Sequence, residues 1–290
     1  MPSRSGGEID WRSALTSLTE TMPQRPGALA WPPAAPGEVL HWPLPALHRF
    51  DRWLMRGISL LGCRQVVSIS GLAHIQPERD PFIVALNHNN RSEAVLVPTL
   101  MMLHRGGRLI RFLADWNYSL IPGIGLIYRR AGIIMLTRKP ARPRLLNLLK
   151  PLYRHPLSAL ERSRALLMQG CSIGLFPEGA INRDPDTLLH GRRGAAWLSL
   201  ATGAPVVPVG IRFPERQPGR RICDLDRMDV QIGAPLMPPL SSHRPRLADT
   251  RAFHAAIMTD IARLSGKSLA KRTCDETSNP HAEEIGHARA

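Results

Sequence analysis

The 290-residue chain has few of the residues that mark several common classes of protein. Its four cysteines (Cys63, Cys171, Cys223 and Cys274) lie far apart, with no CxxC pair and no Cys/His pair at metal-ligand spacing. Neither a zinc module nor a disulfide scaffold is therefore indicated, and a reducing cytoplasm fits best. No apolar run reaches the roughly 18 residues that span a bilayer, and the N-terminus lacks the apolar core of a signal peptide. We therefore expect a protein of the cytoplasm without a spanning helix.

Lysine is also scarce, and the positive charge of the chain comes almost entirely from arginine. Of 38 basic residues only Lys139, Lys150, Lys267 and Lys271 are lysine, and 23 acidic residues leave a net charge of +15. Residues 43–150 hold 16 basic and 5 acidic residues, so this stretch carries most of the excess. Charge concentrated in this way indicates an anionic partner: nucleic acid, a membrane surface, or a phosphorylated or acidic substrate.

Nucleic acid is the least favoured of these partners. Aromatic side chains, on which single-stranded bases stack, make up only 5% of the chain. No RRM, KH, helix-turn-helix or zinc pattern is present either. We therefore expect no nucleic-acid partner.

Short β-rich runs alternate with helical stretches over most of the chain. The predicted strands are 66–70, 82–87, 109–114, 133–136, 172–176, 206–211 and 229–233. The predicted helices lie near 93–103, 155–169, 191–203 and 247–264. This alternation predicts an α/β fold: a single layered domain over residues 63–264, with a mixed, mostly parallel central sheet flanked by helices.

The two ends of the chain have a different composition from this domain. Residues 1–42 are rich in Pro, Gly, Ser and Thr, which predicts a flexible leader, and residues 265–290 are polar, which predicts a disordered tail. Between leader and domain, residues 43–62 predict an amphipathic helix, because apolar residues recur every three or four positions from Leu47 to Leu61. That helix either lies in an anionic membrane interface or packs on the core, since the stripe alone does not say what covers it.

The segment NHNNRSE at 87–93 is the first candidate for chemistry. A predicted strand ends at Asn87, His88 follows at once, and Ser92 stands where it could cap the next helix. Loops after the carboxyl ends of strands are where α/β folds place reactive groups. Glu93, in the first turn of the helix, can fold back to the His88 imidazole and leave its other nitrogen free as a general base. The spacing alone is weak evidence, because His and Glu occur five residues apart in many proteins.

The second candidate is GCSIGLFPEG at 170–179. Its G-x-S-x-G pattern suggests a hydrolase nucleophile at Ser172, but a nucleophile elbow needs a strand before the serine and a helix after it. Here the predicted order is reversed, so we expect no nucleophilic serine. The strand ends in FPEG, where Glu178 and Gly179 enter a loop whose backbone N–H groups suit an anion. Arg192 and Arg193 stand near the positive end of the next predicted helix.

The third candidate is the basic stretch YRRAGIIMLTRKPARPR at 128–144. Arg138 follows a predicted strand and could hold a phosphate bidentately, whereas the other basic residues are as well explained by solvent exposure. No Walker A loop, HExxH motif or dinucleotide fingerprint occurs in the chain.

Taken together, four blocks in order resemble the glycerolipid acyltransferase family, which includes the 1-acylglycerol-3-phosphate acyltransferases. They are NHNNRSE at 87–93, GIIMLTR at 132–138, FPEG at 176–179 and APVVPVG at 204–210. Two positions depart from the family pattern: Glu93 stands where Asp is usual, and Ala180 stands where Thr or Ser follows FPEG. The first change leaves a carboxylate that can still reach His88, and the second puts the identity of the acceptor in doubt.

The resemblance implies transfer of a fatty acyl group from acyl-CoA or acyl-acyl carrier protein to the hydroxyl of a lysophospholipid-type acceptor. It implies His88 and Glu93 as catalytic residues, and Arg138, Glu178, Gly179 and Asn87 as substrate-binding residues. Arg193, Val207 and Pro208 are implied at a phosphate or acyl pocket. No metal or cofactor is implied beyond the acyl donor. The alternatives are another lyso-lipid acceptor, such as a lyso-ornithine lipid or glycolipid, or an inactive lipid-binding relative. With its charge, we expect the protein at the cytoplasmic face of an anionic membrane, as a peripheral protein.

Overall fold

The computed structural model describes residues 31–270, apart from 32, 34, 138, 142, 217, 218 and 240–243. Its centre is a seven-stranded sheet in the order β1-β8-β7-β2-β5-β3-β4. These strands are β1 Val66–Ser70, β2 Ile83–Leu86, β3 Arg111–Asp115, β4 Ile134–Leu136, β5 Ile173–Leu175, β7 Val206–Arg212 and β8 Met228–Ile232. All seven predicted strands are confirmed to within about two residues at each end.

The sheet is parallel except at one junction. Strands β7, β2, β5, β3 and β4 run parallel to one another, β8 pairs antiparallel with β7, and β1 pairs parallel with β8. The predicted fold class, a mixed and mostly parallel sheet flanked by helices, is therefore confirmed. Strand β2 lies in the middle with all four residues buried, as expected for a strand covered on both faces.

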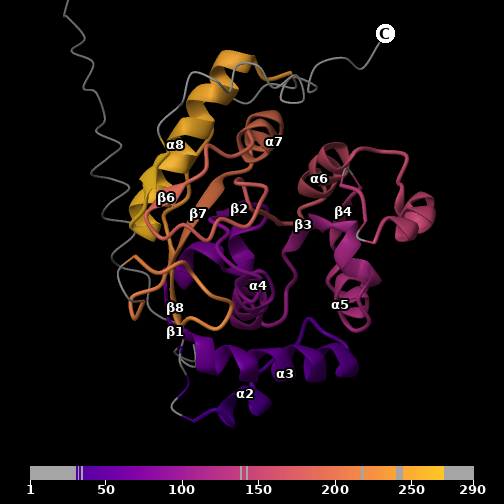
Figure 1. Cartoon of the computed structure of the whole chain (residues 1–290), viewed down its shortest axis with the longest axis vertical. Coiled ribbons are helices and arrows are strands. Elements are labelled where there is room, and N and C mark those ends of the chain that lie inside the picture. The colour runs from indigo at the N-terminus through magenta and orange to yellow at the C-terminus, as the bar shows by residue number, and fades with distance from the viewer. Residues whose placement is uncertain are drawn as a thin grey trace, which may run out of the picture. The chain divides into compact units, whose positions relative to one another are not determined.

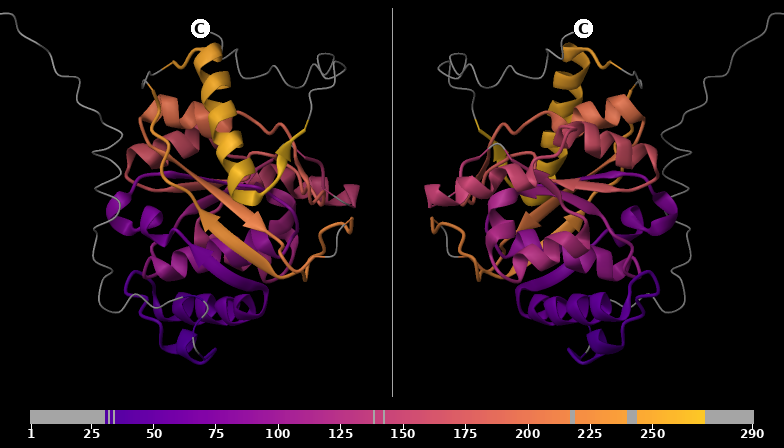
Figure 2. Two further views of the ribbon diagram at one scale, coloured as in Figure 1. Left: turned by 90° about the vertical axis from the view of Figure 1, so that its left-hand side faces the viewer. Right: turned by 90° about the vertical axis from the view of Figure 1, so that its right-hand side faces the viewer.

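Helices cover the sheet on both faces, as Figures 1 and 2 show. Helices α6 Ala159–Met168, α7 Gly194–Thr202 and α8 Leu247–Ser265 lie on one face, and α3 Arg49–Gln65 and α4 Glu93–His104 on the other. Helix α4 is apolar around most of its circumference and buried along most of its length, which is typical of a core helix. Helix α6 begins at a capping box between Ser158 and Glu161, four residues after the predicted start.

The remaining elements are short. They are α2 Glu38–His41, α5 Ile124–Ala131, the 3₁₀ helices η1 Leu72–Ile75, η2 Pro77–Arg79, η3 Trp116–Leu120 and η4 Arg144–Tyr153, and the strand pair β6 Thr187–Leu188 and β9 Ser268–Leu269. Sequence patterning did not predict α5, which lies between Gly123 and Gly132, or η4, which contains Pro151. Both segments are short or interrupted by proline, so their helical period is weak.

Trp31 and residues 35–42 fold against the domain, although they fall in the expected leader. Trp31 and Trp42 are buried, and the Trp31 indole Nε1 donates to the Val66 carbonyl at 2.9 Å. The next segment forms α3, which begins six residues later than the expected helix and packs on α4 through Met55 and Gly62. The rest of the expected leader, residues 1–30, lies outside the described part of the chain.

Residues 266–270 likewise fold, although they fall in the expected tail. Gly266 ends α8 in the left-handed conformation with φ of 70°, and β9 then pairs parallel with β6. Between them Lys267 is buried. Residues 271–290, the rest of that expected tail, lie outside the described part of the chain.

Candidate active site

The carboxyl ends of β2 and β5 place two of the sequence blocks side by side. The two strands are parallel neighbours, with Ile83 opposite Ile173 and Ala85 opposite Leu175. The loops that follow them, 87–92 and 176–182, therefore leave the sheet at the same edge. This is the edge at which open α/β sheets bind their ligands.

His88 and Glu93 are in direct contact at this edge. The His88 Nδ1 atom lies 3.0 Å from Glu93 Oε1, and the Glu93 side chain has no exposed surface. A carboxylate on Nδ1 favours the tautomer with the proton on that nitrogen, which leaves Nε2 as the acceptor. The His88 side chain is 16% exposed, and its Nε2 has no hydrogen-bond partner among the described residues. The imidazole is thus oriented from one side and open on the other.

Asn89 holds the carboxylate that orients His88. Its backbone N–H donates to Glu93 Oε1 and its side-chain Nδ2 donates to Glu93 Oε2 at 2.9 Å. Both carboxylate oxygens therefore have donors, which offsets the cost of burying the charge. These bonds fix the longer Glu93 side chain that stands where the resembling family usually has Asp. Sequence reasoning missed Asn89, and no motif signal marks it.

The first turn of α4 is capped differently from the expectation. Ser92 occupies the cap position, but its Oγ donates to the Asp224 carbonyl at 2.5 Å and lies 3.1 Å from Asn90 Oδ1. The Glu93 backbone N–H instead donates to Asn90 Oδ1 at 2.9 Å. The cap is therefore Asn90, because the Ser92 hydroxyl is used to hold the loop at residue 224.

Phe176 lies against the imidazole. Its ring centroid is 4.4 Å from that of His88, with the two planes 31° apart. Phe112 packs against Phe176 in turn, at 6.0 Å between centroids. The aromatic contact limits rotation of His88 about its side-chain bonds. FPEG therefore contributes a residue that orients His88, which its sequence pattern did not indicate.

Glu178 of FPEG makes hydrogen bonds within the protein through both carboxylate oxygens. Oε1 accepts from the His88 backbone N–H at 2.9 Å, and Oε2 accepts from Asn182 Nδ2 and the Leu189 N–H. With its side chain buried, Glu178 fixes the His88 loop to the loop before β6. The resemblance implies that Glu178 binds substrate. In this arrangement, however, both of its carboxylate oxygens already accept hydrogen bonds from the protein.

Gly179 follows in a tight turn. Its φ is 67°, and its N–H donates to the Phe176 carbonyl at 3.0 Å. Contrary to the expectation from the sequence, this N–H is therefore not free to bind an anion. A side chain at this position would meet Arg192, whose Nε would lie 3.0 Å from an added Cβ. Glycine is thus required both by the positive φ and by the approach of Arg192.

Basic side chains surround Gly179 at the surface. Lys139 Nζ lies 3.4 Å from the Gly179 carbonyl and forms an ion pair with Asp115 at 2.8 Å. Arg192 is exposed beside the turn, and Arg193 is the half-buried cap residue of α7. Arg138 lies outside the described residues, next to Lys139. A phosphate-bearing ligand at this edge would therefore contact Lys139 and Arg192. The sequence analysis favoured Arg138 for this role and neither of these two residues.

The other predicted substrate-binding residues are used by the fold. The Asn87 side chain is fully buried and pairs with the Ile211 backbone, accepting from its N–H at 2.8 Å and donating to its carbonyl at 3.0 Å. Val207 and Pro208 are buried in β7, where they pair with Val84 and Ala85 of β2. None of the three borders the apolar groove described below.

Ser172 has no partner suited to a nucleophile. Its Oγ donates to the Asp80 carboxylate and accepts from the Phe82 N–H at 3.1 Å, and the residue is buried at the start of β5. These bonds link β5 to the loop before β2. The geometry agrees with the expectation that Ser172 is a structural residue.

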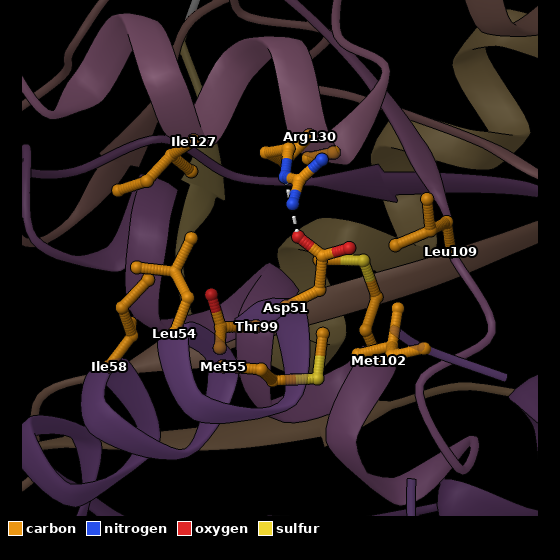
Figure 3. Close-up of a pocket in the computed structure, with 11 residues that line it drawn as sticks. Asp51, Leu54, Met55, Ile58, Thr99, Met102, Leu109, Ile127 and Arg130 are labelled. Carbon is orange, nitrogen blue, oxygen red and sulfur yellow. Dashed lines mark ion pairs between the residues drawn. The ribbon is translucent and has the colours of Figure 1, made fainter. Parts of the chain in front are cut away.

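An apolar groove lies between α3, α4 and α5 (Figure 3). The groove is open to solvent, and its empty space amounts to about 410 Å³ when the open part is counted. Leu54, Ile58 and Ile127 lie on one side of an ion pair between Asp51 and Arg130, whose atoms are 2.8 Å apart. The predicted stripe of the N-terminal helix thus contributes Leu54 and Ile58 to a groove rather than to the core.

Within the described ranges, no group of three or more His, Cys, Asp or Glu side chains is placed to hold a metal ion. No helix in that part of the chain is long and apolar enough to cross a membrane.

The chain is similar to a known protein family over about half of its length. A family model named Acyltransferase matches residues 66–212, which contain β1 to β7 and both loops of the site. The chain also matches a solved structure, that of the 1-acyl-sn-glycerophosphate (LPA) acyltransferase PlsC from Thermotoga maritima, at 20% identity and a TM-score of 0.49. That match covers 81% of this chain and 90% of the other. The comparison with curated proteins finds no match. Because the family model spans half of the chain, including His88 and Glu93, the protein belongs to the Acyltransferase family.

Proposed function

We propose that this acyltransferase moves a fatty acyl group from a thioester donor, acyl-CoA or acyl-acyl carrier protein, to the hydroxyl of a lysophospholipid. We favour 1-acylglycerol-3-phosphate as the acceptor. The observation that carries the proposal is the His88–Glu93 contact, with Nδ1 held at 3.0 Å and Nε2 unpartnered among the described residues. This arrangement suits a general base that removes a hydroxyl proton.

The reaction needs one proton shuttle and no covalent enzyme intermediate. His88 Nε2 takes the proton from the acceptor hydroxyl as the oxygen attacks the thioester carbonyl carbon. The buried Glu93 carboxylate stabilises the imidazolium that forms. When the tetrahedral intermediate collapses, the C–S bond breaks and the thiolate leaves with the proton from Nε2. Ester and free thiol are the products, and His88 returns to its neutral form.

Basic side chains beside the FPEG turn support a phosphate-bearing acceptor. Lys139 and Arg192 both adjoin Gly179, in the same FPEG turn that carries Phe176 against His88. A guanidinium can hold a phosphate through two parallel hydrogen bonds, and an ammonium adds a mobile point charge. We infer that these residues, together with Arg138 in the adjoining segment, bind the head group. Ala180 is exposed beside them and leaves the choice among lyso-lipid acceptors to experiment.

The apolar groove supports a substrate with a long acyl chain. Thr99 and Met102 line it from α4, six and nine residues after Glu93. At 1.5 Å per residue these positions lie roughly 9 and 14 Å along the helix from the catalytic carboxylate. A chain whose ester or thioester lies at His88 could therefore extend along α4 into the groove.

Exposed leucines support contact with a membrane. In η4, Leu145, Leu148 and Leu152 are 72%, 77% and 79% exposed, and Arg144 and Lys150 accompany them. Helix α3 exposes Trp53 and Leu61 as well. Apolar side chains beside basic ones favour an anionic lipid surface. We infer that the protein binds such a surface peripherally, where lyso-lipid acceptors reside.

A product screen tests the proposal. The purified protein is incubated with one acyl-CoA, or with acyl-acyl carrier protein, and a panel of lyso-lipids, and the acylated products are identified by mass spectrometry. We expect acylation of lysophosphatidic acid, with none above background for His88→Ala. Acylation of only a lyso-ornithine lipid or glycolipid would correct the acceptor. Lipid binding without turnover would show that the protein is an inactive lipid-binding relative and not an enzyme.

A further inference from the structure

A buried lysine from the C-terminal segment lies against the catalytic pair. Lys267 follows Gly266, the residue at which α8 ends, and comes 55 residues after the last residue of the family match at 212. Its ammonium donates to Asn89 Oδ1 and, at 2.6 Å, to the Asp184 carbonyl. The mechanism proposed above does not use it.

Hydrogen bonds connect this ammonium to the imidazole in three steps. Lys267 Nζ donates to Asn89 Oδ1, Asn89 Nδ2 donates to Glu93 Oε2, and Glu93 Oε1 contacts His88 Nδ1. An amide side chain can be turned either way, but only one orientation directs its oxygen to a cation and its nitrogen to a carboxylate. Asn87 Nδ2 also donates to Asn89 Oδ1, at 3.3 Å, so Lys267 and Asn87 together determine which end of Asn89 faces Glu93.

Charge provides a second link between Lys267 and the site. The groups that act electrostatically on the ammonium are Glu93 from α4, Glu178 from the FPEG loop, and Asp184 and Asp186 from the loop before β6. Burial lowers the pKa of the Lys267 ammonium, and these four carboxylates oppose that effect. Two of them, Glu93 and Glu178, are the buried carboxylates that hold His88. A cation at this point offsets the cost of burying both negative charges.

We propose that Lys267 is a positioning residue that holds the Glu93 carboxylate in the correct orientation through Asn89, and so sets the basicity of His88. The residue touches no substrate; it acts through Asn89 and Glu93. The inference rests on the proposed general-base function of His88. It also explains why the end of α8 returns to the sheet edge and pairs through β9, since that pairing delivers Lys267 to the site.

The test compares Lys267→Met, which keeps much of the side-chain length without charge, with Ser268→Ala as a matched control. Ser268 follows Lys267 directly, and Ser268→Ala removes the hydrogen bond from its Oγ to the Asp186 carbonyl while it leaves the Lys267 ammonium in place. For Lys267→Met we expect a fall in kcat of about tenfold or more with little change in KM. We also expect the acidic limb of the kcat/KM profile to move to higher pH, because removing a nearby cation favours the protonated imidazole of His88 beside the Glu93 carboxylate.

A measurement without substrate separates this inference from the proposed function. The pKa of the His88 imidazole is followed by NMR, with its signal assigned by His88→Gln. We expect Lys267→Met to raise that pKa by about half a unit or more, and Ser268→Ala to leave it unchanged. If the pKa of His88 in Lys267→Met equals that in the parent protein, the inference is overturned, even if the enzyme is active. A raised pKa in a protein that forms no acyl product supports the inference while the proposed function fails.

A second variant covers the case in which Lys267→Met does not fold. Lys267→Gln retains a hydrogen-bond donor without the charge, and Lys267→Arg retains a charge with a bulkier head. We expect Lys267→Arg to keep more activity than Lys267→Gln, with a pH profile closer to that of the parent. Loss of folding in all three, while Ser268→Ala folds, would assign Lys267 to stability alone and overturn the proposal.

Discussion

The interior around Glu93 and the surface helix η4 differ in what surrounds their side chains. Around Glu93, both carboxylate oxygens are bonded by His88 and Asn89, and Asn89 is bonded in turn by Lys267. In η4, three of ten residues are leucines exposed by more than 70%. In the first region the polar groups are hydrogen-bonded inside the protein. In the second, apolar side chains are exposed to solvent.

This difference separates two tasks that the proposed reaction requires. General-base catalysis needs an imidazole held in one orientation, which buried and fully paired hydrogen bonds provide. Access to a lipid acceptor needs apolar surface that gains free energy only on contact with a membrane. A change in the first region should alter the chemistry and leave membrane binding intact, and a change in the second should do the reverse. The predictions below test this separation.

The largest effect is expected from Glu93→Gln. The amide keeps the shape of the side chain but not the charge that stabilises the imidazolium, so we expect kcat to fall by about 10²-fold or more. Turnover of a soluble lyso-lipid analogue measures this, and Glu93→Asp should retain part of the activity. Glu161→Gln, at the exposed capping box of α6, is the matched control. If Glu93→Gln kept the turnover of the parent protein, the charge of Glu93 would have no catalytic role and the hydrogen bonds around it would be structural only.

A change at the other end of α4 should affect stability without affecting chemistry. Burial lowers the pKa of His104 to about 4, and its Nε2 has no hydrogen-bond partner among the described residues. Between pH 6.5 and 4 the unfolded chain binds a proton here that the folded protein does not. The free energy of unfolding therefore decreases as pH falls through this window, by up to about 3 kcal/mol.

His104→Phe should remove that part of the pH dependence and keep an aromatic ring beside Trp42. Denaturant unfolding at a series of pH values measures the effect, and turnover at pH 7 should equal that of the parent. An unchanged slope of stability against pH would mean that His104 does not titrate as a buried neutral group. A change in turnover at pH 7 would show that the two ends of α4 are not independent.

An intermediate effect is expected from the double variant Leu148→Asn and Leu152→Asn. Withdrawing two partly inserted leucines should weaken binding to anionic vesicles about ten- to thirtyfold, at roughly 1 kcal/mol for each. Vesicle sedimentation at low salt measures this, and turnover of a soluble acceptor should not change. Leu225→Asn is the control, because Leu225 is 78% exposed but lies outside η4. Equal losses from both variants would contradict a specific contact through η4, and a change in oligomeric state would point to a second copy of the chain instead.

The smallest effect is expected from filling the groove. Ile127→Trp should reduce turnover of long-chain relative to short-chain substrates several-fold, because the larger ring fills part of the space that the end of a long chain would occupy. Leu126→Trp, on an exposed position of the same helix, is the control. A parental chain-length profile for Ile127→Trp would place the acyl chain elsewhere.

Several features were predictable because they are local in the chain. The seven strands follow from short β-rich runs, and the contact between His88 and Glu93 spans only five residues. The separation of Ser172 from any catalytic role follows from the order of helix and strand around it. By contrast, α3 packs through Met55 and Gly62, and Leu54 and Ile58 face a groove. An apolar stripe does not specify which surface covers it.

The substrate-binding residues were harder to assign from motifs. Asn87 and Glu178 were expected to meet substrate, but Asn87 pairs with Ile211 and Glu178 with the His88 and Leu189 backbone. A buried polar residue in a motif can serve either the ligand or the fold, and only its hydrogen-bond partners distinguish the two. Lys139 and Arg192 reach the turn at Gly179 from separate segments, and their approach depends on how those segments pack.

The scarcity of lysine acquires a specific meaning in the structure. The sequence by itself determined the excess of arginine and the order of the four blocks, which are read directly from it. It also determined the alternating strands and helices, because each depends on neighbours within a few residues. Only the tertiary structure decided that Lys267 lies beside Asn89, 178 residues away, and that β2 and β5 are neighbours. Such contacts depend on the order of strands in the sheet and on the path of α8, which local patterns do not encode.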